Sequence, residues 1–153
     1  MSGSAPRPLA LHPPRNTSPT ELAVHEDRYN ARYAKGKSRH DRRGDLYVAK
    51  IDSDGEICIK VGRTNDLERR TKEHRRRCKL DEDEFVVKFN VGVQSASFSE
   101  SLLHHRLKTV GFVVSKTTCE CGTRHIERYA SSLESLQEDI DEVIEWIDEV
   151  RDL

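Results

Sequence analysis

The segment that decides the fold is GDLYVAKIDSDGEICIKVGRTNDLERRTKEH, residues 44–74. It holds two runs in which apolar and polar residues alternate as in strands, 45–51 and 56–62. Between them stands Asp-Ser-Asp-Gly at 52–55, and such residues favour tight turns. The segment predicts an antiparallel β-hairpin followed by a helix.

The alternation within the hairpin assigns its side chains to two faces. Successive side chains of a strand point to opposite faces of a sheet. The apolar residues of both runs share one face: Leu46, Val48, Ile57, Ile59 and Val61. If that face packs inward, Tyr47 and Lys60 lie together on the other face, which must then be a functional site or a second packing surface.

The helix after the hairpin is rich in arginine. Thr64 or Asn65 is expected to cap its first turn, and it should run to about Lys79. One side carries, at helical spacing, Leu67, Arg70, His74 and Cys78. A stripe that begins at Leu67 should face the protein, which draws Arg70 inward, where a charge needs a partner. The opposite side is basic, with Lys72, Arg75, Arg76, Arg77 and Lys79.

The rest of the chain predicts one further strand and two further helices. The strand covers about 85–93, and a helix covers about 97–110. Residues 112–130 are expected to be irregular, and an amphipathic helix capped by Ser131 and Glu134 follows. The order β-β-α-β-α-α implies an α+β fold with a small three-stranded antiparallel sheet flanked by helices.

Composition and charge divide the chain into three parts. Of its 153 residues 35% are charged, and no apolar run is long enough to span a membrane, so we expect a soluble, intracellular protein of the nucleus or cytoplasm without a membrane partner. Residues 1–43 hold nine Lys/Arg against four Asp/Glu and predict a disordered basic arm with a short helix. The domain proper is expected at 44–130, and 131–153 form an acidic amphipathic helix. The basic front half can attract a polyanion.

Several motifs, in their order and spacing, resemble the GIY-YIG nuclease superfamily. They are LYV at 46–48, KVGRT at 60–64, ERR at 68–70, ESLLHHRL at 100–107 and HIERY at 125–129. They are most similar to the bacteriophage T5-type DNA-binding domain branch, including its fungal members. The resemblance implies a GIY-YIG-like fold that binds DNA, with RNA left open, and that acts in some members as a metal-dependent endonuclease.

The resemblance also assigns roles to four residues. Tyr47 matches the first-motif tyrosine, Arg70 the helix arginine and Glu100 the metal-binding glutamate, while Lys60 replaces the second tyrosine. In the nucleases the tyrosine activates a water or acts as base, the arginine stabilises the phosphate, and the glutamate holds Mg²⁺ or Mn²⁺. A lysine cannot act as both donor and acceptor as a phenol does. The replacement leaves cleavage open, whereas phosphate binding is expected.

Each of these residues also has a purely structural interpretation. Tyr47 fits a half-buried strand aromatic, and Glu100 fits a capping box with Ser97. Arg70 fits a buried ion pair with Glu100. Direct contacts to nucleic acid are expected from the basic residues around the helix, namely Arg63, His74, Arg75, Arg76 and Arg77. The alternative function is a catalytically inactive protein-interaction module that uses the acidic C-terminal helix.

A cluster of metal-binding residue types forms the last candidate site. Zinc is held in structural sites by four cysteine or histidine ligands. The candidate ligands are Cys78, Cys119, Cys121 and His125, and fungal members of the resembled branch carry a similar cluster. The alternative is a set of reduced thiols in a loop. His104 and His105 are possible substitute ligands, but they are expected on a helix surface.

Overall fold

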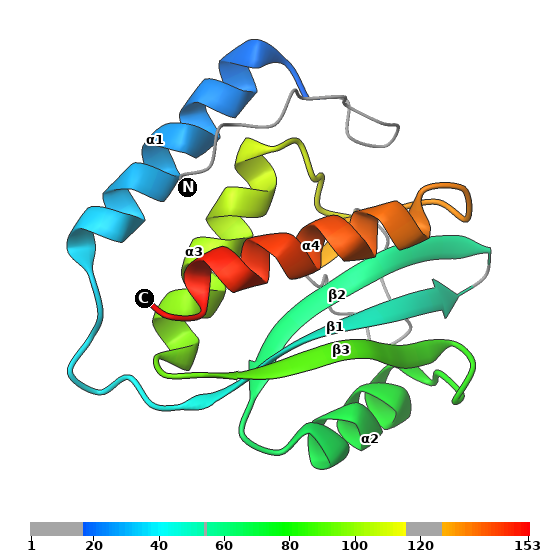
Figure 1. The fold of residues 1–153 in the computed structure, drawn as a ribbon. Helices are drawn as coiled ribbons and strands as arrows, with labels where there is room; N and C mark the ends of the chain where they lie inside the picture. Colours follow the sequence, from blue (N-terminus) through cyan, green and yellow to red (C-terminus); the bar gives the residue numbers. More distant parts are fainter. Residues whose placement is uncertain (1–16, 54, 116–126) are drawn as a thin grey trace.

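Residues 17–53, 55–115 and 127–153 are described by a computed structural model of the chain. They form an α+β fold in which four helices surround a four-stranded antiparallel sheet of order β3-β1-β2-β4 (Figure 1). The predicted α+β class is confirmed. None of the described helices is both long and apolar enough to cross a membrane.

The sheet contains the predicted hairpin and one strand that was not expected. β1 (Gly44–Ser53) and β2 (Glu56–Thr64) pair as a hairpin, and β3 (Phe85–Val93) pairs with β1. β4 (Arg128–Ala130) pairs with β2, so the prediction of three strands is wrong. β4 lies in a segment expected to be irregular, because three residues are too few for an alternation to show.

Helices cover both faces of the hairpin (Figure 1). On one face α3 (Ala96–Thr109) and α4 (Leu136–Val150) pack on the sheet around a larger core that includes Leu46, Val48, Ile59 and Val61. On the other face α2 (Leu67–Cys78) covers a smaller core that includes Tyr47, Ala49, Ile51 and Phe85. Residues 58–62 of β2 are accordingly all buried. The face that carries Tyr47 is thus a second packing surface.

The N-terminal helix belongs to the packed domain. α1 (Pro19–Lys35) confirms the predicted short helix and lies against α3. The guanidinium carbon of Arg106, on α3, lies 4.0 Å from the ring centre of Tyr29 on α1 and 5.2 Å from that of Trp146 on α4. Such cation–π contacts are attractive, and here one side chain links three helices.

Two helices begin at residues other than those predicted. The carboxylate of Asp66 caps α2 by accepting the N–H of Arg69, so neither Thr64 nor Asn65 is the cap. α4 begins after Ser135 instead of Ser131, and its apolar side is buried within the domain, with Ile140, Val143, Ile147 and Val150. A protein partner at α4 would therefore meet its acidic side.

The start of α3 depends on a residue far away in the sequence. Both carboxylate oxygens of Asp41 accept backbone N–H groups at this end, from Ser97 at 3.0 Å and from Phe98 at 2.9 Å. The Ala96 N–H donates to the Arg42 carbonyl at 2.8 Å. The predicted capping box of Ser97 and Glu100 is not formed, which leaves the Glu100 carboxylate available for other contacts.

Candidate functional site

Tyr47 lies directly opposite Gly62 across the β1–β2 pair. A Cβ atom at position 62 would lie 2.7 Å from the Tyr47 hydroxyl oxygen and 2.9 Å from Cζ, so the phenol occupies the space a side chain would fill. Tyr47 is 1% exposed, and its hydroxyl shares a hydrogen bond of 3.0 Å with Nε2 of His74. His74 is itself buried and stacks on Phe85. The glycine of the KVG motif is explained by the ring that covers it.

Burial controls the ionisation of Tyr47. It raises the pKa of the phenol to about 12, and the Arg70 guanidinium beside the ring acts in the opposite direction. The carboxylates of Glu127 and Glu100 add to the increase. Burial outweighs the nearby cation, so the net shift is upward. The phenol stays protonated near neutral pH, and its hydroxyl shares a hydrogen bond with His74.

Lys60 lies beneath the surface of the same region. It is 2% exposed, and its ammonium nitrogen lies 3.4 Å from Oε1 of Glu127. Burial lowers the pKa of Lys60, while Glu127 raises it and Arg128 and Arg70 lower it. Lys60 is therefore connected to the site through its ion pair with Glu127.

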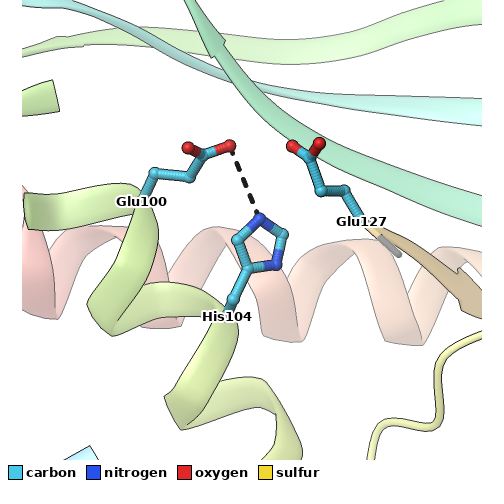
Figure 2. A group of neighbouring side chains, drawn as sticks. All are labelled: Glu100, His104 and Glu127. Atoms are coloured by element: carbon cyan, nitrogen blue, oxygen red, sulfur yellow. Dashed lines mark ion pairs between the residues drawn. The ribbon is translucent and has the colours of Figure 1, made fainter. Parts of the chain in front are cut away.

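Two carboxylates and an imidazole, those of Glu100, Glu127 and His104, meet in one group (Figure 2). Glu100 and His104 stand one turn apart on α3, and Glu127 immediately precedes β4. One ligand atom from each of the three lies within 4.8 Å of the others. Nε2 of His104 lies 3.5 Å from Oε2 of Glu100, and Nδ1 shares a hydrogen bond of 2.5 Å with the buried Tyr129 hydroxyl. This Glu100–His104–Glu127 group is called the acidic cluster below.

The donor set of the acidic cluster fits a divalent cation. Carboxylate oxygens are the ligands of Mg²⁺ and Mn²⁺, and an added imidazole favours Mn²⁺ over Mg²⁺. Within the described part of the chain, Nε2 of His104 is buried and lacks a hydrogen bond, although it lies 3.5 Å from Oε2 of Glu100. Tyr129 fixes the ring through Nδ1, as outer partners of metal-binding histidines do. Burial opposes ionisation of Glu100, but His104, Glu127 and Arg63 outweigh it and hold its pKa below the usual value.

Sequence reasoning missed two of these three side chains. It placed His104 on a helix surface, with a substitute zinc ligand as the alternative, and gave Glu127 no role. The spacing Glu100-x₃-His104 was a usable signal, because residues four apart share one face of a helix. Glu127 carried no local signal, since only the pairing of β4 with β2 brings it to the cluster.

The arginines around the cluster differ in their exposure. Nε of Arg63 lies 3.1 Å from Oε1 of Glu100, and the Arg63 side chain is 52% exposed. Arg70 lies beside Tyr47, is 34% exposed, and contacts Glu73 at 4.0 Å. The arginine paired with Glu100 is thus Arg63, whereas the sequence had offered an Arg70–Glu100 pair.

The remaining predicted contact residues fall into two groups. His74 is buried, so its predicted direct contact to nucleic acid does not fit the structure, and its role is to hold Tyr47. Arg75 donates from two guanidinium nitrogens to the Phe85 carbonyl, at 3.2 and 2.8 Å, which fixes it on the sheet. Arg76 and Arg77 are exposed on α2 as predicted.

One of the four predicted zinc ligands lies in the described part of the chain. Cys78 is buried at the end of α2, and Nη2 of Arg128 lies 3.2 Å from its sulfur. Cys119, Cys121 and His125 fall outside the described residues. The zinc site stays a prediction.

Fold and site together define a class of protein: a small α+β domain in which a hairpin tyrosine, a helix arginine and a helix glutamate surround one polar site. Residues 44–151 match the T5orf172 domain family, and the chain belongs to this family. The match extends from β1 through α4 and leaves α1 outside. No curated protein and no solved structure matches the chain.

Proposed function

We propose that this domain binds DNA and cleaves its phosphodiester backbone with a divalent cation, Mn²⁺ or Mg²⁺, held by the acidic cluster. The observation that carries the proposal is the position of that cluster, which lies beside three cationic side chains and a buried tyrosine. Membership in the T5orf172 family supports a nucleic-acid-related role.

The charges of the site suit a phosphodiester. Arg63 and Arg70 reach the surface, where a guanidinium can pair with phosphate oxygens through two hydrogen bonds. Glu100 now pairs with Arg63, and Glu127 with Lys60. A phosphate that attracts Arg63 would leave the Glu100 carboxylate open to a cation. When bound, the cation supplies positive charge at the phosphate oxygens.

Tyr47 has a positioning role in this proposal. Its phenol is protonated at neutral pH, and His74 fixes its hydroxyl. The phenol in turn lies beside Arg70 and constrains where the guanidinium rests. A base of pKa about 12 is poorly matched to a reaction at neutral pH, so we assign proton abstraction to another group than Tyr47.

The test combines metal binding with cleavage. Calorimetry should show Mn²⁺ binding that Glu100→Gln weakens at least about tenfold, while Glu134→Gln, an exposed acid outside the cluster, leaves it unchanged. With Mn²⁺, the wild-type protein should nick duplex, branched or single-stranded DNA. Glu100→Gln and Arg70→Ala should each reduce the rate by about 100-fold or more. Cleavage that persists in both variants would refute the assignment, and RNA substrates tested in parallel would show the preferred nucleic acid.

A further inference from the structure

A hollow lined with arginine opens next to the acidic cluster. It measures about 560 Å³ and lies between the linker that precedes β1, the end of β2, and the first turns of α2 and α3. This volume is in the range of ligand-binding sites. Its cationic lining comes from four arginines, Arg42, Arg43, Arg63 and Arg69. The two linker arginines belong to a segment expected from the sequence to be part of a disordered arm.

The linker is held in place by its contacts with α3. Both carboxylate oxygens of Asp41 accept N–H groups of α3, and the carbonyl of Arg42 accepts the N–H of Ala96 at 2.8 Å. Arg42 and Arg43 are therefore presented from an anchored backbone. Asp41 is the one acid among the described residues that line the hollow, and its charge is directed to the helix end.

Three of the arginines of the hollow, all except Arg63, are weakly engaged within the protein. Nη1 of Arg42 contacts the adjacent backbone carbonyl at 3.3 Å, and Nε of Arg43 donates to Gln94 at 3.0 Å. Arg69 lies 3.7 Å from an exposed carboxylate of its own helix, a pairing worth about 0–1 kcal/mol. A phosphate can recruit these side chains without breaking a buried interaction.

We propose that the hollow binds a backbone phosphate of the nucleic-acid strand whose neighbouring phosphate lies beside Arg63 and the cation proposed for the acidic cluster. The inference rests on the proposed function and deepens it. Arg63 connects the two places, because it lines the hollow while its Nε lies 3.1 Å from Glu100. A strand carries phosphates at regular intervals, so a strand that reaches Glu100 passes Arg63 and presents its next phosphate to the hollow.

The test compares two pairs of charge-removing substitutions in the full chain. Arg42→Gln/Arg69→Gln removes two positive charges from the lining of the hollow. Arg28→Gln/Lys88→Gln removes two exposed charges outside the hollow, one on α1 and one on β3. Binding of a fluorescent 15-base-pair DNA duplex is measured by anisotropy across a salt series. The hollow pair should weaken binding at low salt by about 10-fold or more and reduce the slope of log K against log salt by about 0.9, the loss of one phosphate contact. The control pair should change affinity less than about threefold.

A local probe separates a bound phosphate from a general charge effect. Amide resonances of Gly44 and Ser97, which line the hollow, should shift when a 5′-phosphorylated thymidine dinucleotide is added. These shifts should disappear in Arg42→Gln/Arg69→Gln and persist in the control pair. Wild-type protein that binds no DNA overturns the proposed function and the hollow together. If wild-type protein binds DNA but both substituted pairs lose affinity equally, the proposed phosphate contact in the hollow is refuted, and the proposed function is not.

Discussion

Replacing Gly62 by alanine tests the packing on which the site depends. The added carbon would lie 2.7 Å from the Tyr47 hydroxyl and 2.9 Å from Cζ, and the ring is buried and held by His74. Overpacking of this kind costs about 1–3 kcal/mol, and loss of the Tyr47–His74 hydrogen bond adds about 1 kcal/mol. The stiffer alanine backbone offsets about 0.5–1 kcal/mol. We expect Gly62→Ala to lower the free energy of unfolding by about 1–3 kcal/mol.

The measurement is urea denaturation of four proteins in a double-mutant cycle. In a Tyr47→Leu background the ring is gone, so Gly62→Ala should cost less than about 0.5 kcal/mol, which gives a clear coupling energy between the two positions. Gly92→Ala is the matched control, because a carbon there meets its nearest atom, in Asp45, at 3.7 Å. The reasoning fails if Gly62→Ala destabilises no more than Gly92→Ala, or if its full cost persists without the ring.

Three further predictions concern a helix cap, a buried phenol and a metal ligand. Asp41→Ala should lower the free energy of unfolding by about 1–2 kcal/mol because α3 loses its cap. Asp41→Asn should retain part of the cap, because its amide oxygen accepts while its amide nitrogen cannot; urea denaturation measures both. Because the pKa of Tyr47 is raised from 10.0 to about 12, its stabilising contribution is full below pH 10 and is lost as pH rises through 12. Tyr47→Phe should flatten this alkaline decline by up to about 3 kcal/mol, and an unchanged decline would argue against a buried phenol. His104→Ala should weaken Mn²⁺ binding at least about tenfold by calorimetry, and unchanged affinity would remove the imidazole from the ligand set.

The elements themselves were largely predictable from periodicity. Alternation of period two placed Leu46 and Val48 on one face and Tyr47 on the other, as the two cores confirm. The stripe of α2 was confirmed in the same way, since His74 and Cys78 are buried. Periodicity is a local property of the sequence, so the buried face of a strand or helix can be predicted from it without knowledge of the rest of the fold.

Exact helix starts and the short strand β4 depended on distant partners. The cap of α3 comes from Asp41, more than fifty residues away, and no local pattern connects the two. β4 has three residues, and its place is set by pairing with β2. Contacts of this kind decide which of several similar local signals is used.

The same long-range contacts decide what Glu100 can do. From local sequence, its simplest role was to complete a capping box with Ser97, and a carboxylate engaged in that way would not serve a cation or an arginine. Asp41 takes over the N–H groups of that helix end, and Glu100 turns instead to Arg63 and His104. The linker that supplies Asp41 also supplies two arginines of the hollow. Availability of the glutamate and the position of these arginines therefore depend on the same anchored segment, which ties the proposed phosphate contact to the proposed cation site.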